Sequence, residues 1–214
     1  MVDHASGSMV IRSTVDKLEA KAVVTPAAEE TSRNDRSKTG PTRRKPTRPA
    51  PRRRRAPSPK GLKGSFAVLD ELTVAYLDFA GSNAETIAHL RENGRITLMW
   101  CAFQGPPNIV RVHGRGEPVF RDDPRFKELL THFPDIDPAP HGLRAIIVVT
   151  AELIRDTCGY AVPFMTYEED RELHAKRFAR EDDVSLEAYF RKKEHVETSL
   201  DGLPGLPLPL PPGS

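Results

Sequence analysis

The sequence predicts a mainly β protein, an antiparallel barrel with peripheral helices. Apolar strand patterns separated by turns occur at 66–77, 95–103, 109–119 and 145–154. Helical spacing lies between or after these strands and does not alternate with each of them, which argues against a parallel βαβ sheet. The chain also contains neither GxGxxG nor GxxxxGK[ST], the signatures of a dinucleotide fold and of a P-loop.

The length and composition indicate one domain with a long N-terminal segment. Of the 214 residues, 20 are prolines, and residues 1–57 are rich in Pro, Ser, Thr, Lys and Arg. Such a segment buries too little apolar surface to offset the entropy of ordering. We therefore predict a disordered segment at 1–57, a folded domain at 58–198 and a Pro/Leu-rich tail at 199–214.

The charge distribution and the cysteines bear on partners and location. The net charge is only +2, but Arg52–Arg55 form a basic run. No aromatic residues are interleaved with this run to stack on bases, so we do not expect a nucleic-acid partner. The two cysteines, Cys101 and Cys158, lack metal-ligand spacing, and the scattered histidines lack it too, so we expect no metal site and a reducing cytoplasm. No apolar run approaches the ~18 residues of a membrane span.

The first strand pair leads into a predicted helix. We expect a turn at Asp70-Glu71, and the second strand breaks at Gly81. Ser82, followed three residues later by Glu85, reads as a capping box that starts a helix at Ser82. The helix should run to about residue 93 and end at Gly94. Its buried side chains are expected to be Ile87 and Leu90.

A strand that enters a helix through a Gly-Ser turn can bind an anion. The turn leaves unpaired backbone N–H groups at the positive end of the helix dipole, an arrangement suited to phosphate. Lys60, between Pro59 and Gly61, is close enough in sequence for a hairpin to bring it alongside Ser82. Spacing alone nevertheless favours an ordinary capped helix and a surface lysine, because most capping boxes bind nothing.

The later elements complete the expected barrel. In the strand at 95–103 one face carries Ile96, Leu98 and Trp100, and in the strand at 109–119 glycines allow a bend or close approach. A short helix should follow at 124–133, and the strand at 145–154 is the most apolar and should be central. The amphipathic pattern of residues 168–195 predicts a pair of helices with a break near Asp182-Asp183. Its expected inward residues are Leu173, Phe178, Leu186, Tyr189 and Phe190, and the tail leucines Leu203, Leu206, Leu208 and Leu210 could lie over a groove.

Several motifs occur in an order that resembles a known family. They are Ser-Pro-Lys-Gly at 58–61, Tyr-Leu-Asp-Phe-Ala-Gly-Ser-Asn-Ala-Glu-Thr at 76–86, Arg-Ile-Thr-Leu-Met-Trp at 95–100 and Arg-Val-His-Gly-Arg-Gly at 111–116. With 156–163 and 199–206, this order resembles the pyridoxamine 5'-phosphate oxidase-like family of split-barrel flavin-binding proteins, and within it a bacterial branch. The resemblance covers roughly 58–206. It implies a split-barrel homodimer with a flavin mononucleotide (FMN) site at the subunit interface, and an oxidoreductase that passes hydride between the flavin and a small-molecule substrate.

The resemblance also implies the residues of the phosphate site. Lys60 matches the lysine that contacts the cofactor in the family, and Ser82 and Asn83 stand at the helix start. Related flavin proteins often carry Arg-Lys just after the serine, where this chain has Asn83-Ala84. The phosphate site therefore has less positive charge, which allows weaker binding or a different flavin, such as the deazaflavin F420.

Four further residues are candidates for cofactor contacts. Ser58 and Tyr76 could contact the ribityl chain or the edge of the ring, or they could be a turn residue and a core residue. Arg95 and Arg111 could approach the phosphate or a substrate anion, and ordinary surface salt bridges explain them equally well.

Two departures from the family leave alternatives open. The only tryptophan, Trp100, lies mid-chain, and the C-terminal tryptophan and arginine segment of a true pyridoxamine phosphate oxidase is not found. The chain could therefore be a deazaflavin-dependent reductase, a non-catalytic flavin or haem carrier, or a degenerate dimeric binding module. Relatives also carry a first strand before Ser58, where this chain has a run of arginines. Either Met9–Val24 supplies a substitute strand, or the first strand is missing.

Overall fold

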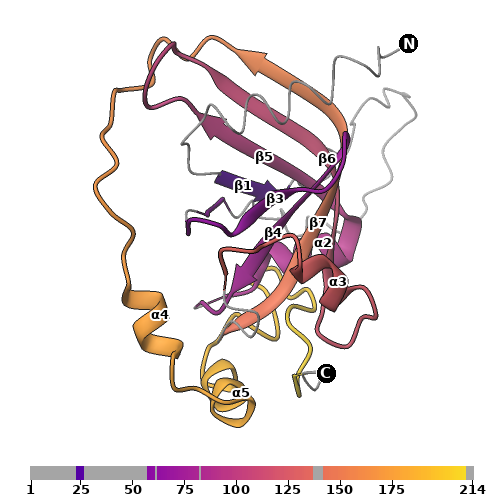
Figure 1. Cartoon of the computed structure of the whole chain (residues 1–214). Helices are drawn as coiled ribbons and strands as arrows, with labels where there is room; N and C mark the ends of the chain where they lie inside the picture. Colours follow the sequence, from indigo (N-terminus) through magenta and orange to yellow (C-terminus); the bar gives the residue numbers. More distant parts are fainter. Residues whose placement is uncertain (1–22, 27–56, 61, 82, 137–141, 211–214) are drawn as a thin grey trace, which may run out of the picture.

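The fold is one antiparallel sheet with few helices. The computed structural model describes residues 23–26, 57–60, 62–81, 83–136 and 142–210 (Figure 1). The strands are β1 Val23–Pro26, β2 Ser58–Pro59, β3 Phe66–Val68, β4 Thr73–Phe79, β5 Arg95–Cys101, β6 Ile109–Val119 and β7 Leu143–Thr157. Their order in the sheet is β2-β1-β5-β6-β7-β4-β3, and every neighbouring pair is antiparallel. The predicted mainly β, antiparallel class is therefore confirmed.

The sheet curls around its larger core. Phe66 of β3 and Trp100 of β5 meet edge to face with ring centroids 5.3 Å apart, although three other strands separate β3 from β5 in the sheet. On β5, Ile96, Leu98 and Trp100 are all buried, as their alternation predicts. The same core receives the apolar side chains of helix α2 (Glu85–Asn93). One end of the curled sheet is thus closed by a helix.

The strand β1 bears on whether the sheet has a substitute for the first strand of the family. It pairs with β5, from Val23 opposite Met99 to Pro26 opposite Ile96, and also with β2. This strand shares only Val23 and Val24 with the predicted substitute, Met9–Val24, whose other residues lie outside the described ones. It falls within the segment for which the composition predicts disorder. Apart from Val23–Pro26 and Pro57, that segment lies outside the described residues.

The backbones of β6 and β7 lie so close together at Gly114 that a glycine is needed there. The register of the pair shifts between His113 and Gly114, as at a β-bulge. A Cβ atom at Gly114 would lie 2.1 Å from the backbone oxygen of Thr150, so no larger residue fits without separating the strands. The predicted close approach is confirmed here.

Helix α2 begins later than predicted. Its N-cap is Ala84, no side chain caps it, and the carboxylate of Glu85 accepts a hydrogen bond from Leu200 N at 2.8 Å. The predicted role of Glu85 in a capping box is therefore wrong, because the distant C-terminal segment takes its carboxylate; Ser82 lies outside the described residues. The helix ends as predicted at Gly94, which has φ 69°.

A second, smaller core lies on the other face of β4. It contains Leu77, Leu143 and Phe133, together with Phe126 of helix α3 (Phe126–Leu130). Helix α3 is shorter than the predicted 124–133. Because the two faces of β4 and β7 are both covered, these strands are apolar on both sides, as a buried strand requires.

The predicted helix pair is present as α4 (Leu173–Phe178) and α5 (Asp183–Arg191). An extended segment runs along the side of the molecule from β7 to α4 (Figure 1). Phe178, Leu186 and Phe190 are buried, but Leu173 is 70% exposed, so its predicted inward position is wrong. It stands at the first position of α4, where the chain arrives from the exposed segment.

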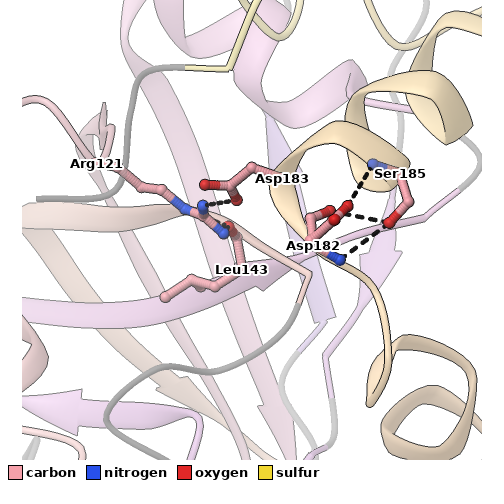
Figure 2. Close-up of polar contacts among 5 residues, drawn as sticks. All are labelled: Arg121, Leu143, Asp182, Asp183 and Ser185. Atoms are coloured by element: carbon pink, nitrogen blue, oxygen red, sulfur yellow. Dashed lines mark hydrogen bonds and ion pairs between the residues drawn. The ribbon is translucent and has the colours of Figure 1, made fainter.

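The start of α5 is capped and tied to the sheet. Figure 2 shows the capping box: Asp182 Oδ1 accepts from Ser185 N at 2.8 Å, and Ser185 Oγ accepts from Asp182 N at 3.0 Å. Arg121 forms an ion pair with Asp183 and donates to the carbonyl of Leu143 from Nη2 at 3.1 Å. The break in the helix pair lies where the sequence predicts it.

The C-terminal segment packs into the main core. Leu206 is 2% exposed, while Leu208 and Leu210 pack partly against the same cluster. The predicted covering role of the tail is confirmed for these leucines. In the part of the chain that the structure describes, no helix has the length and apolar character needed to cross a bilayer.

Candidate functional site

A small cleft opens at the N-terminus of α2. Its volume is about 60 Å³, and it is lined by Pro57, Ser58, Lys60, Asp78, Asn83–Ile87 and Arg144. Three segments that are far apart in the sequence therefore meet here: the end of β2, the end of β4 with the first turn of α2, and the start of β7. Positive side chains and backbone N–H groups come together at one point.

Two cations share one buried carboxylate in this cleft. Lys60 Nζ lies 2.9 Å from Asp78 Oδ1, and Arg144 Nη2 lies 2.8 Å from Asp78 Oδ2. The side chains of Asp78 and Arg144 are 2% and 5% exposed, and that of Lys60 is 20% exposed. Burial alone would raise the pKa of Asp78, but the charges of Arg144 and Lys60 and their hydrogen bonds outweigh it and lower this pKa. The carboxylate is thus held in its charged form.

The sequence reasoning missed Arg144, and a bulge explains its position. Asp78 lies opposite Ala145 and Phe79 opposite Leu143, so Arg144 is the extra residue on β7. The bulge lets its side chain reach Asp78 instead of following the alternation of the strand. A charged residue at the start of the most apolar strand was a signal, because such a residue is seldom buried without a partner.

The first turn of α2 contributes its backbone. The first N–H groups of an α-helix have no partner within the helix. The N–H of Ala84 donates to the carbonyl of His195 at 2.8 Å, while Glu85, Thr86 and Ile87, the next residues, line the cleft. Arg144 Nη1 donates to the carbonyl of Asn83 at 2.7 Å and so holds the entry of the helix against β7.

The cleft is lined by two cations, Lys60 and Arg144, and two carboxylates, Asp78 and Glu85, and Lys60 is the more exposed of the two cations. Arg144 and Asp78 are buried together and neutralise each other, which leaves Lys60 as the more exposed partner. Its ammonium has three N–H donors and gives one to Asp78, so two can reach a ligand. A lysine of this kind beside the first turn of a helix is suited to an anion, phosphate above all.

The other predicted residues of the site are placed as follows. Ser58 and Asn83 line the cleft with Lys60, and Ser82 lies outside the described residues. Tyr76 is 2% exposed in the main core, with its ring centroid 5.6 Å from Lys60 Nζ. Burial, and then the charge of Asp78, raise the pKa of Tyr76, whose hydroxyl has no hydrogen-bond partner among the described residues.

The two predicted arginines are not part of this cleft. Arg95 is exposed at the start of β5, and its backbone N–H donates to Asn93 Oδ1 at 2.9 Å. Arg111 donates from Nη1 to Thr157 Oγ1 at 3.0 Å. The structure therefore brings together Ser58, Lys60 and Asn83, sets Tyr76 beneath Lys60, and leaves the arginines on the sheet.

Comparisons with solved structures give only a weak likeness. HupZ of Group A Streptococcus is 13% identical, with a TM-score of 0.47, covering 70% of this chain and 100% of that chain. A putative pyridoxamine 5'-phosphate oxidase of Listeria innocua is 12% identical, with a TM-score of 0.41, covering 68% of this chain and 94% of that chain.

The comparisons of sequence give closer matches than the comparisons of structure. Residues 56–158, which contain most of the cleft, match the family described as pyridoxamine 5'-phosphate oxidase. The pyridoxamine 5'-phosphate oxidase family protein ustO of Aspergillus flavus is 35% identical over 161 residues. That match covers 70% of this chain and 64% of ustO, so the chain spans about two thirds of its relative's length. On these two matches, the chain belongs to the pyridoxamine 5'-phosphate oxidase family.

Proposed function

We propose that this protein binds FMN and acts as an oxidoreductase on a small-molecule substrate. The observation that carries the proposal is the cleft in which the partly exposed ammonium of Lys60 lies beside the first turn of α2. Both elements lie within residues 56–158, the part of the chain that matches the family. The geometry supports binding of a phosphorylated ligand, and the family makes a flavin the first candidate.

The residues of the cleft fit the phosphate end of such a cofactor. About 60 Å³ is room for a phosphate group, whereas pockets for whole drug-sized ligands measure roughly 300–1,000 Å³. Lys60 and the N–H groups of Glu85–Ile87 would hold the phosphate, and Ser58 stands at the rim for the next part of the ligand. When bound, the flavin ring supplies the hydride chemistry, while the protein binds and orients it.

The small size of the cleft also supports a homodimer. The flavin ring must lie outside the cleft, and a second copy of the chain would cover it and exclude water. Apolar side chains that such a copy could bury are exposed beyond β7, among them Tyr160 and Phe164, each 85% exposed. The homodimer and the cytoplasmic location inferred from the sequence are part of this proposal.

A non-catalytic carrier is the second candidate. It is favoured by the ion pairing of Lys60 with Asp78, which reduces the charge available to a ligand. The same contacts would hold the phosphate of a deazaflavin such as F420. Binding and catalysis therefore need separate measurements.

The test is a titration of the purified protein with FMN, riboflavin, F420 and inorganic phosphate, followed by flavin or deazaflavin fluorescence and by calorimetry. We expect FMN to bind more tightly than riboflavin, because only FMN carries the phosphate. Equal affinity for FMN and riboflavin would contradict the proposed site. Enzymatic reduction of the bound flavin by a nicotinamide cofactor would distinguish the oxidoreductase from the carrier, and light scattering would report the dimer.

A further inference from the structure

Two pairs of arginines lie across neighbouring strands on the outer face of the sheet. Arg95 of β5 stands opposite Arg115 of β6, and Arg111 of β6 stands opposite Arg155 of β7. Alternation places them on the face turned away from the main core, because Val112, the residue beside Arg111, is buried in that core. Like charges that stand directly opposite each other destabilise an antiparallel pair. Each pair of arginines therefore needs a counter-charge.

The first pair has its counter-charge within the chain. Arg115 Nε lies 3.1 Å from Glu152 Oε1. Glu152 is the extra residue on β7 at the register shift between His113 and Gly114, where the two strands form a bulge. The bulge therefore brings a carboxylate to the pair of Arg95 and Arg115.

The second pair has no such carboxylate. Within the described residues, neither Arg111 nor Arg155 forms an ion pair. Asp156 follows Arg155 directly, but it stands opposite the buried Val110, so alternation turns it to the other side of the sheet. Glu152 is engaged by the first pair. In the part of the chain that the structure describes, these two positive charges thus stand side by side without a counter-ion.

The side chain of Arg111 lies over β7, on the side of Arg155. Its Nη1 donates to Thr157 Oγ1 at 3.0 Å, and Thr157 follows Arg155 by two residues on the same face of β7. This bond uses one of the five N–H donors of the guanidinium. The other donors of Arg111 and those of the exposed Arg155 can therefore hold the oxygens of one anion between them.

The surroundings of this pair suit an organic anion. His113 is the next outward residue of β6, and its Nδ1 lies 3.0 Å from Thr97 Oγ1, which leaves Nε2 for a further polar contact. Met99 stands opposite Arg111 on β5, and Leu153, which is 50% exposed, stands opposite His113 on β7. Positive charge and apolar surface therefore lie side by side on this face.

This place on the sheet is remote from the Lys60 cleft. Arg144 of the cleft and Arg155 are on the same strand, β7, and at about 3.3 Å per residue they are about 35 Å apart along it. The C-terminal end of β7, in orange at the top of Figure 1, lies away from α2. A flavin phosphate held in the cleft therefore does not supply the counter-charge that Arg111 and Arg155 need.

We propose that Arg111 and Arg155 form a second anion site, which binds a doubly charged oxyanion of a small molecule, either a phosphate or a pair of carboxylates. The two guanidiniums supply two positive charges, and a phosphate monoester carries close to two negative charges at neutral pH. The planar fork of arginine matches the oxygens of either group. Because the bound anion removes the repulsion between the two arginines, it also stabilises the folded protein.

The test is a calorimetric titration of the full-length Lys60→Gln protein with inorganic phosphate and with succinate, without flavin and at constant ionic strength. Lys60→Gln weakens the cleft, so the remaining affinity reports the sheet. In this background we expect Arg155→Gln to bind the better of the two ligands about tenfold more weakly. Arg111→Lys should have a similar effect, because it keeps the charge and loses the fork. The control is Arg115→Gln on the same face, which should leave the affinity unchanged because Arg115 is engaged by Glu152.

Equal losses for Arg155→Gln and Arg115→Gln would overturn the proposal, because they would show a response to net charge and not to a site. Failure of both phosphate and succinate to bind the Lys60→Gln protein would overturn it as well. Tighter binding of phosphate would assign a phosphate group to the ligand, and tighter binding of succinate would assign a dicarboxylate. Since no flavin is present and Lys60 is replaced, failure of this test leaves the proposed function untouched, and failure to bind flavin leaves the second anion site untouched.

Discussion

Asp78 and Arg144 form a buried ion pair across a β-bulge, with Arg144 Nε and Nη2 at 3.0 and 2.8 Å from Asp78 Oδ2. The two residues are 66 positions apart in the sequence, and each has apolar neighbours on both sides in its strand. The pair holds Lys60 on one side and the carbonyl of Asn83 on the other. It therefore links the stability of the sheet to the shape of the cleft.

Replacing Asp78 should be strongly destabilising. Asp78→Asn leaves the buried guanidinium of Arg144 without its counter-charge, and breaking a buried pair in this way costs about 3–5 kcal/mol. The measurement is the free energy of unfolding in urea at neutral pH. Asp123→Asn, which breaks the exposed pair with Arg125, is the matched control and should change stability little. A loss for Asp78→Asn no larger than that of the control would contradict the buried pair.

The cost of the same change should depend on pH. The pKa of Asp78 is lowered in the folded protein, so its carboxylate contributes stability above the unfolded pKa of about 3.9. This contribution is lost as the pH falls through the folded value. The difference in stability between the unmodified protein and Asp78→Asn should therefore shrink below about pH 4. Unfolding curves at a series of acidic pH values would show this, and a constant difference would argue against it.

Lys60 should act on the ligand rather than on the fold. Lys60→Gln removes the more exposed cation of the cleft, and we expect about tenfold weaker FMN binding, near 1.4 kcal/mol, with little change for riboflavin. Fluorescence titrations with both ligands measure the two affinities. Lys63→Gln, which changes an exposed lysine three residues on, is the control. An equal loss for both ligands would mean that Lys60 does not contact the phosphate.

Gly114 should tolerate no side chain. Gly114→Ala places a methyl group 2.1 Å from Thr150 O, so β6 and β7 must separate, at a cost of about 1–3 kcal/mol or more. Gly81→Ala is the control, because a Cβ there meets nothing within 4 Å. Thermal unfolding of the two variants compares them directly. Equal midpoints would show that the bulge relaxes around the new methyl group.

The capping box of α5 offers a further test. Asp182→Ala and Ser185→Ala each remove one of the two reciprocal hydrogen bonds shown in Figure 2, and each should lower the thermal midpoint. Because the bonds form one unit, the double variant should lose less than the sum of the two single changes. Simple additivity would indicate that the two side chains act independently.

The sequence predicted the elements whose signals are local. Alternation placed Ile96, Leu98 and Trp100 in the core, the left-handed glycine ended α2 at Gly94, and the break between α4 and α5 was expected at Asp182. Each of these depends on residues within one turn or one strand, so a short window contains the cause. The order of the motifs likewise predicted the family. It also suggested that Lys60 and the start of α2 form one site.

Only the tertiary structure decided which distant groups meet. Glu85 looked like part of a capping box, but Leu200 takes one of its carboxylate oxygens. Arg144 entered the cleft through a bulge that no periodicity reveals, and β1 joined the sheet from a segment whose composition predicts disorder. Buried charges and strand edges are satisfied by whichever partner the fold brings within reach. The sequence can show that a charged residue or a strand edge needs a partner. The three-dimensional packing determines which residue becomes that partner.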